Sequence, residues 1–249
     1  MSSPFFKFKQ FTVWHDRCAM KVGTDGVLLG AWTPYTIHHT PYTNTPARVL
    51  DIGTGSGLIA LMLSQRFPTA IIDAIDIDEA AVAQARDNFA ASPWSDRLHA
   101  HHISLQDYTN DQRLTTNDKY NLVVSNPPFF TDSLKNPDAA RRLARHTDTL
   151  SLDELFACAA DLLTDDGLFS LILPADSKSQ ILNLKSQMLN GFHLSHLTRV
   201  YPKPGKPVKR LLMTFTKKES PLIEDSLFIE SESSHRSPEY STLTAEFYL

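Results

Sequence analysis

The pattern of apolar and polar residues along the chain changes period several times. Compact apolar runs of strand length recur in the middle part, at residues 48–52, 70–76, 98–103 and 120–125. Stretches of helical length and period separate the first of these runs, at residues 57–66 and 78–89. Because strands that alternate with helices form parallel pairs, the pattern predicts a mainly parallel sheet with helices on both faces.

The second half of the chain continues this alternation but ends differently. Ser151 and Glu154 form a capping-box pattern that opens a helix reaching residue 163. After it we expect a turn at 165–167, a strand at 168–173, a helix at 177–189 and strands at 193–200 and 211–216. The last two strands are joined by residues 201–210, which are too few for a crossover helix, so these strands must be antiparallel. The predicted fold class is therefore α/β.

The flanks of this alternating region are less regular. Residues 5–13 mix aromatic residues and lysines and are expected to pair as short strands, and residues 34–46 predict an exposed connection. Thr24 or Asp25 can cap a short helix between them, which is either a flap over a ligand or a helix packed on the first core strand. We interpret the chain as one domain, in which residues 1–47 are the flap segment, 48–218 the catalytic core and 219–249 a C-terminal extension.

Three glycines follow the first core strand with one residue between each pair. Gly53, Gly55 and Gly57 form a G-x-G-x-G turn that leads directly into a helix. Glycines let a ligand approach the backbone, and the start of a helix offers unpaired N–H groups. Leu58 stands where a dinucleotide fingerprint has its third glycine, and no Lys-Ser/Thr pair follows as in a P-loop. The turn predicts a ligand cradle of another kind, unless it is only a structural strand–helix turn.

Two aspartates flank this glycine turn. Asp76 ends the second strand, where strand–helix–strand geometry brings it beside the turn and within reach of ribose hydroxyls. Asp51 precedes the glycines and can accept a hydrogen bond from an amine or orient the turn. An acidic cradle suits a cationic ligand that has a ribose and no phosphate. S-adenosylmethionine is such a ligand.

The chemistry follows from the loop after the fourth strand, Asn126-Pro127-Pro128-Phe129. Ligands of open α/β sheets bind at the carboxyl ends of the strands, so this loop should face the glycine turn. Two prolines stiffen the loop and leave carbonyls without an N–H partner, and Asn126 adds an amide oxygen. Two rigid acceptors can hold an exocyclic NH₂ in line for methyl transfer, while Phe129 offers a nucleobase a stacking face. The alternative is a rigid turn with aromatic core residues.

Together these motifs resemble the S-adenosylmethionine-dependent amino-methyltransferases that carry an N-P-P-[YF] loop. Residues 20–32 and the pair Arg145-His146 are similar to the bacterial tRNA1(Val) (adenine-N6)-methyltransferase family. The resemblance covers residues 11–218. It implies a Rossmann-like class I methyltransferase fold with a seven-stranded, mostly parallel sheet, an antiparallel last strand and helices on both faces.

The resemblance also implies roles for single residues. Asn126 and the Pro127 carbonyl would hold the target amine, with Pro128 and Phe129 completing the catalytic loop. Asp107, after the third strand, would bind the adenine amino group of the cofactor, although an aspartate there can equally cap a loop. The cofactor-binding residues that we expect are Lys21, Thr24, Asp51, Gly53, Gly55, Gly57, Asp76, Asp107 and Asn126.

Local charge, rather than the net charge of −4, favours a nucleic-acid substrate. Residues 201–218 contain no acid but include Lys203, Lys206, Lys209 and Arg210. Arg141 and Arg145 follow the N-P-P-F loop, and both groups could neutralise phosphates at one edge. Phe130, with the loop after it, could receive a base taken out of its stack. The alternative is a solvated, lysine-rich hairpin that protects an edge strand.

By resemblance, the expected substrate is the N6 amine of adenine 37, next to the anticodon of tRNA1(Val). Guanine N2 in ribosomal RNA, glutamine N5 in a protein and a non-catalytic cofactor-binding module stay open as alternatives. The two cysteines show no metal-binding spacing, the first residues lack a signal-peptide pattern, and no apolar run approaches the ~20 residues of a membrane span. We therefore expect a cytoplasmic protein that needs neither a metal nor a membrane.

Overall fold

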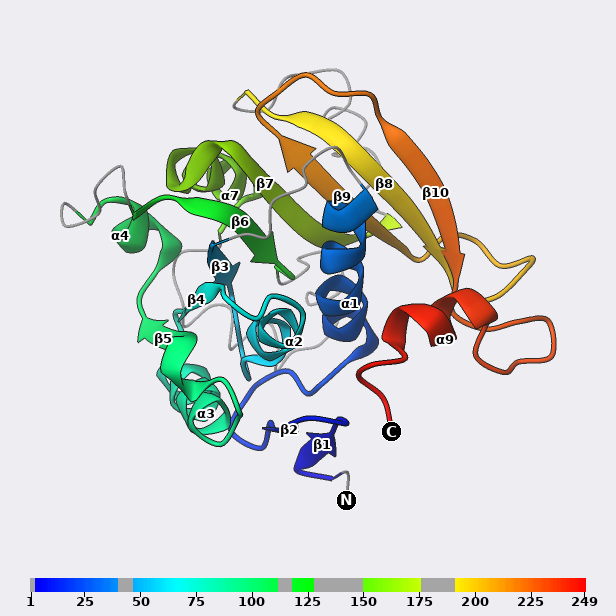
Figure 1. Cartoon of the computed structure of the whole chain (residues 1–249), viewed down its shortest axis with the longest axis horizontal. Coiled ribbons are helices and arrows are strands. Elements are labelled where there is room, and N and C mark those ends of the chain that lie inside the picture. Colours follow the sequence, from blue (N-terminus) through cyan, green and yellow to red (C-terminus); the bar gives the residue numbers. More distant parts are fainter. Residues whose placement is uncertain (1–2, 40–46, 112–117, 128–149, 176–190) are drawn as a thin grey trace.

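In the part of the chain that the structure describes, the fold is organised around one eight-stranded sheet (Figure 1). The computed structural model describes residues 3–39, 47–111, 118–127, 150–175 and 191–249. The strands of the sheet are β3 (Arg48–Ile52), β4 (Ile71–Asp76), β5 (Leu98–His102), β6 (Tyr120–Ser125), β7 (Leu163–Pro174), β8 (His193–Tyr201), β9 (Arg210–Thr216) and β10 (Ile223–Phe228). They are arranged in the order β10-β8-β9-β7-β6-β3-β4-β5.

The direction of the strands agrees with the prediction. β9 runs antiparallel to β7 and β8, and all other neighbouring strands are parallel. All seven predicted strands are present, so the mostly parallel sheet with an antiparallel hairpin is confirmed. The eighth strand, β10, lies in the C-terminal extension, where no strand was predicted.

Helices cover both faces of this sheet (Figure 1). One face carries α1 (Thr24–His39), α2 (Leu58–Arg66), α3 (Glu79–Ala90) and α9 (Pro238–Thr244), and the other carries α4 (Leu105–Thr109) and α7 (Leu152–Leu162). Val49 belongs to the first core and Leu50 to the second, because successive side chains of a strand point to opposite faces. The capping box of Ser151 and Glu154 is confirmed at the start of α7.

The N-terminal segment is partly as predicted. Strands β1 (Phe5–Lys7) and β2 (Thr12–Trp14) form a separate antiparallel pair. The exposed connection expected over residues 34–46 is wrong at its start, since α1 continues through Pro34 to His39 and Pro34 is buried. Residues 40–46 lie outside the described residues. A proline inside a helix removes one backbone hydrogen bond. Here the apolar surface that α1 buries against α2 and the sheet, including Val27 and Leu28, offsets that loss.

A second correction concerns the start of β7. The predicted turn at 165–167 lies inside the strand, which begins at Leu163 directly after α7. The pairing shifts from Tyr120–Leu163 to Leu122–Leu168, so β7 has extra residues relative to β6 at this point. The acidic pair and the glycine of this stretch therefore form a bulge rather than a turn that ends the element.

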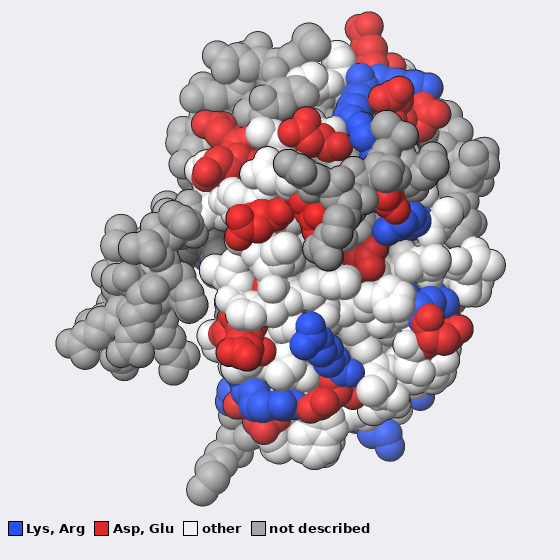
Figure 2. Space-filling view, turned by 90° about the vertical axis from the view of Figure 1, so that its left-hand side faces the viewer, with Lys and Arg blue, Asp and Glu red and all other residues white. Residues whose placement is uncertain are grey.

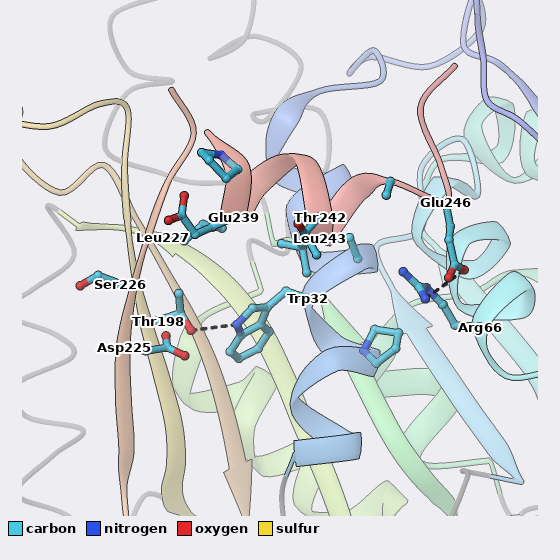
Figure 3. Close-up of a pocket in the computed structure, with 14 residues that line it drawn as sticks. Trp32, Arg66, Thr198, Asp225, Ser226, Leu227, Glu239, Thr242, Leu243 and Glu246 are labelled. Atoms are coloured by element: carbon cyan, nitrogen blue, oxygen red, sulfur yellow. Dashed lines mark hydrogen bonds and ion pairs between the residues drawn. The ribbon is translucent and has the colours of Figure 1, made fainter. Parts of the chain in front are cut away.

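The C-terminal extension completes the edge of the sheet and one face of the core. β10 pairs with β8, so the β8–β9 hairpin does not form the edge, contrary to one alternative considered for its lysines. Tyr240 of α9 and Phe247 after it are buried. Figure 3 shows the region between α1, α9 and β10, where the Trp32 indole N–H donates to the Thr198 hydroxyl at 2.8 Å. A cavity of about 680 Å³ lies there.

Candidate functional site

The candidate site lies at the edge of the sheet where the parallel strands end. Ile52 of β3 pairs with Ser125 of β6 on one side and with Ile75 of β4 on the other. The hydroxyl of Ser125 also donates to the carbonyl of Ile52 at 3.0 Å. The glycine turn, the acid that ends β4 and the loop that follows β6 therefore start side by side at one edge. The two motifs that the sequence places far apart are neighbours in the fold, as predicted.

The glycine turn needs its glycines for two different reasons. Gly53, Gly55 and Gly57 have φ angles of 71°, 55° and 83°, which side chains with a Cβ rarely adopt. A Cβ on Gly57 would lie 2.5 Å from Cε1 of Phe89, so this glycine also allows α3 to pack against the turn. Among the residues that the structure describes, a Cβ on Gly53 or Gly55 would meet nothing within 4 Å. This part of the chain leaves the space above the two glycines open, as a cradle for a ligand requires.

Asp51 is a fully buried carboxyl group beneath the turn. Its Oδ2 accepts hydrogen bonds from the Thr54 hydroxyl at 2.7 Å and from the Ala60 backbone N–H at 3.2 Å. Within the described residues its Oδ1 is buried and has no hydrogen-bond partner. Burial raises the pKa of Asp51 to about 7. The residue thus orients the turn with one oxygen and keeps the other available as an acceptor.

Asp76 ties the glycine turn to the end of β4. Its Oδ2 accepts from the Gly55 N–H at 2.8 Å, and its Oδ1 accepts from the Asp78 N–H at 2.9 Å. Burial raises the pKa of this carboxyl above its usual value, against these hydrogen bonds. A carboxylate has about four acceptor positions, so both oxygens of Asp76 can still accept from ribose hydroxyls.

Asn126 stands at the end of β6, beside the glycine turn. Among the residues that the structure describes, its Oδ1 finds no hydrogen-bond partner although the atom is buried. Pro127, which follows, is buried. A buried acceptor without a donor costs free energy, about 1–3 kcal/mol in proteins, unless a ligand supplies the donor. The other members of the predicted loop and its surroundings lie outside the described residues: Pro128, Phe129, Phe130, Arg141 and Arg145.

The start of α1 lies near the same edge. Lys21 and Thr24 are exposed there. Asp25 accepts from Nε of Arg210 at 2.8 Å and forms an ion pair with it, which joins α1 to the first residue of β9. The helix has 16 residues rather than being short, and it packs mainly on α2 instead of on the first core strand. Its role as a flap over a ligand stays a prediction.

Asp107 lies at the first turn of α4, not at a strand end. Its Oδ2 accepts from the Ser104 hydroxyl at 2.7 Å, and its N–H donates to the same hydroxyl oxygen at 3.0 Å. Ser104 is the N-cap of α4, and Asp107 bonds to this cap rather than capping a loop itself. The carboxylate is exposed, so the capping contact leaves it accessible at the edge that follows β5.

The β8–β9 hairpin carries the predicted basic residues to this edge. Arg210 pairs with Pro174 at the end of β7, so the turn from residue 201 to 210 stands beyond the carboxyl ends of the parallel strands. Lys206 and Lys209 are exposed and Lys203 is half-buried. Arg210 differs, because Asp25 already neutralises much of its charge. On the face with α4 and β5, Figure 2 shows Lys and Arg scattered among Asp and Glu, with no continuous basic field on its described part.

A polar residue of α3 that is not among the predicted site residues touches the turn. Asn88 is 1% exposed and donates to the Ser56 carbonyl at 2.8 Å. Gln84, one helical turn earlier, is buried as well. The sequence contains a pattern that could have identified Asn88. Two polar residues four positions apart share the core-facing side of a helix with the apolar Ala81 and Ala85.

Two negative findings apply to the described part of the chain. It contains no helix long and apolar enough to cross a membrane. Nor does it hold a group of three or more His, Cys, Asp or Glu side chains that could bind a metal ion.

Comparisons with known proteins agree on one class. Residues 37–191 match the family described as methyltransferase small domain. A protein of Phocaeicola vulgatus named tRNA1(Val) (adenine(37)-N6)-methyltransferase is 49% identical, with 100% of this chain and 99% of the relative covered. A relative of the same name in Bacteroides fragilis is 47% identical at the same coverage. In fold, the chain is similar to a predicted O-methyltransferase of Agrobacterium tumefaciens, with a TM-score of 0.63, 19% identity, and coverage of 90% of this chain and 96% of that one.

Proposed function

This chain belongs to the tRNA1(Val) (adenine(37)-N6)-methyltransferase family, and on that premise we propose that it methylates the N6 amine of adenine 37 in tRNA1(Val). The methyl donor of this class is S-adenosylmethionine. The observation that supports the reaction best is the buried Oδ1 of Asn126, which has no partner among the described residues and lies beside the open glycine turn. An amide oxygen in this place can accept a hydrogen bond from an exocyclic NH₂.

The residues around the turn fit the cofactor. Gly53 and Gly55 leave open space for it, and the free lone pairs of Asp76 can accept from its ribose. When it is ionised, Asp51 places negative charge beneath the turn, which suits a cation, and within the described residues its Oδ1 has no other partner. When bound, S-adenosylmethionine supplies an electrophilic methyl carbon on its sulfonium. We propose Lys21, Thr24, Gly57 and Asp107 as further contacts.

The chain's own contribution to the step is orientation. Asn126 and the Pro127 carbonyl would each accept from one hydrogen of the adenine amine and so fix the direction of its lone pair. Held in this way, the N6 lone pair would point at the methyl group that bound S-adenosylmethionine would supply, and the methylated amine would release its proton to water. The nucleophile is neutral, so the reaction needs no strong general base. We propose that Phe129 and Phe130 receive the base.

The test is transfer of labelled methyl from S-adenosylmethionine to RNA and protein from cells that lack the gene. We expect label in tRNA, and N6-methyladenosine at position 37 of tRNA1(Val) by nucleoside mass spectrometry. Label in ribosomal RNA guanine or in protein glutamine would assign the same chemistry to another substrate. Binding of the cofactor without any transfer would identify a non-catalytic module. Because tRNA is the substrate, we propose a cytoplasmic location.

Cofactor affinity should depend on pH through Asp51. Its pKa is raised to about 7 by burial, whereas an unfolded chain has a value near 4. Burial therefore favours the neutral carboxyl, and this group's contribution to stability declines as pH rises from about 4 to 7. A cationic ligand favours the ionised carboxylate, so binding below pH 7 must release a proton. The pKa of Asp76 is also raised, so this carboxyl too favours tighter cofactor binding at higher pH.

We therefore expect the Kd for S-adenosylmethionine to fall by roughly 3- to 10-fold between pH 6 and pH 8. Isothermal titration calorimetry in buffers of different ionisation enthalpy measures both this change and the proton release. In Asp51→Asn the dependence should flatten. A Kd that is the same at both pH values in the wild type would contradict the assignment.

Substrate affinity should depend on salt through the hairpin lysines. We propose that Lys203, Lys206 and Lys209 contact tRNA phosphates. Replacing Lys206 and Lys209 by Gln should lower the slope of log K against log salt by about 0.7–0.9 per lost phosphate contact. Filter binding of tRNA at several salt concentrations measures the slope. Lys218→Gln is the control, because this lysine lies at the opposite end of β9 and pairs with Asp166. An unchanged slope in the double variant would remove the hairpin from the interface.

A further inference from the structure

The N-terminal segment from Trp14 to Val22 lies against α3 and the rim of the glycine turn. Arg17 forms an ion pair with Asp87 and donates from its Nε to the Gln84 side-chain oxygen at 3.2 Å. Cys18 lies close enough to Asp76 that burial and this neighbouring charge together raise its pKa to about 11. The segment therefore runs along the same edge as the acid that we propose to hold the ribose.

One side chain joins this segment to the turn. The Oδ1 of Asn88 accepts from the Trp14 N–H at 3.0 Å, and its Nδ2 donates to the Trp14 carbonyl at 2.8 Å. The second hydrogen of Nδ2 has its own acceptor, the Ser56 carbonyl of the glycine turn, at 2.8 Å. The amide thus uses both of its donors, and it does so where it is 1% exposed.

We propose that Asn88 is a positioning residue for the cofactor: it holds the glycine turn in its binding conformation by bonding Ser56, while its two bonds to Trp14 fix the direction of its own amide. Three observations support this assignment. The turn has three residues at positive φ, a conformation that its surroundings must maintain. The residue after Asn88, Phe89, fills the space that Gly57 leaves open. Asn88 and Phe89 thus act on neighbouring parts of one turn.

The inference rests on the proposed function, since it concerns the site for S-adenosylmethionine. The chemistry of the residue suggests a selective variant. In Asn88→Asp the shape is kept, but a carboxylate oxygen replaces the donor and faces two carbonyl oxygens. In Asn88→Ser the bulk of the amide is lost without adding a charge. Gln84→Ala is the matched control, because Gln84 is buried on the same face of α3 and holds Arg17 but not the turn.

The experiment measures the Kd for S-adenosylmethionine by calorimetry, the KM and kcat for methyl transfer to tRNA, and the midpoint of thermal unfolding for each variant. We expect Asn88→Asp to raise the Kd and the KM for the cofactor by about 10-fold or more, with kcat at saturating cofactor within about 2-fold of the wild type. Asn88→Ser should shift both constants in the same direction. Gln84→Ala should lower the unfolding midpoint while leaving the Kd within about 2-fold.

The outcomes separate this inference from the proposed function. If Asn88→Asp and Asn88→Ser bind the cofactor like the wild type, the positioning role is wrong. Equal losses of affinity in Gln84→Ala would also overturn it, because loosening of the N-terminal segment would then explain the effect. If Asn88→Asp fails to fold, Asn88→Ser decides the question. A wild-type protein that does not bind S-adenosylmethionine would instead refute the proposed function.

Discussion

Replacing Asn126 by alanine should lower kcat for methyl transfer by about 100-fold or more, while the Kd for S-adenosylmethionine stays within about 2-fold. The expected loss follows from orientation. The side chain ends in a buried oxygen that lacks a partner within the described residues, beside the open turn where the cofactor fits. Without this acceptor the adenine amine would hydrogen-bond to water instead, and its lone pair would no longer be held in one direction. Single-turnover transfer with pre-bound cofactor measures the step directly.

A control for this experiment exists on the same strand. The Oδ1 of Asn121, at the start of β6, accepts from the N–H groups of Ala47 and Arg48 at 3.0 Å each. Asn121→Ala should therefore lower the free energy of unfolding by about 1–3 kcal/mol and leave kcat unchanged. The contrast separates an asparagine that supports the fold from one that supports the reaction. Transfer by Asn126→Ala at the wild-type rate would refute the proposed mechanism.

Replacing Asp76 by alanine should raise the Kd for S-adenosylmethionine by roughly 10- to 100-fold, as expected when a charged hydrogen-bond acceptor of about 1.5–3 kcal/mol is lost. Two effects add. The ribose loses its acceptor, and the Gly55 and Asp78 N–H groups lose the carboxylate that holds the turn. Equilibrium binding at pH 8 measures the change with Asp51 ionised.

Asp78→Ala is the matched control for Asp76→Ala. Asp78 carries the same charge two residues away, and its Oδ1 accepts from the Ala80 and Ala81 N–H groups as the N-cap of α3. Its loss should cost about 1 kcal/mol of stability with little change in cofactor affinity. If Asp78→Ala weakens binding as much as Asp76→Ala does, the charge of the edge as a whole, rather than a ribose contact, determines affinity.

Local patterns carried much of the prediction. The seven strands of the core were predicted because burial on both faces of a parallel sheet leaves a direct trace in sequence. The positive φ angles of Gly53, Gly55 and Gly57 fit the residue type that adopts them most readily. Asn126 was predicted at the correct edge because the carboxyl ends of parallel strands must meet there. These features can be predicted without knowing which residues from distant parts of the chain contact them.

Errors arose where distant contacts outweigh local preference. Pro34 predicts the end of a helix, yet α1 continues past it because the helix buries apolar side chains in the core. Arg210 was predicted only as one of the basic residues of the hairpin, and no local pattern indicated its ion pair with Asp25, 185 positions earlier. Its contact with RNA stays a prediction. Residues 223–228 lack a clear strand pattern, since the first four are exposed, and become β10 through pairing with β8.

The sequence by itself determined the fold class, the three glycines of the turn and the place of Asn126 at the end of β6, because apolar periodicity and the preference of glycine for positive φ are local properties of the chain. The tertiary structure alone decided how the cradle is held. Asn88 and Trp14 lie 74 positions apart, and no periodicity or spacing relates them. Their contact exists because a buried amide must satisfy its donors, and the folded chain places two carbonyls within reach.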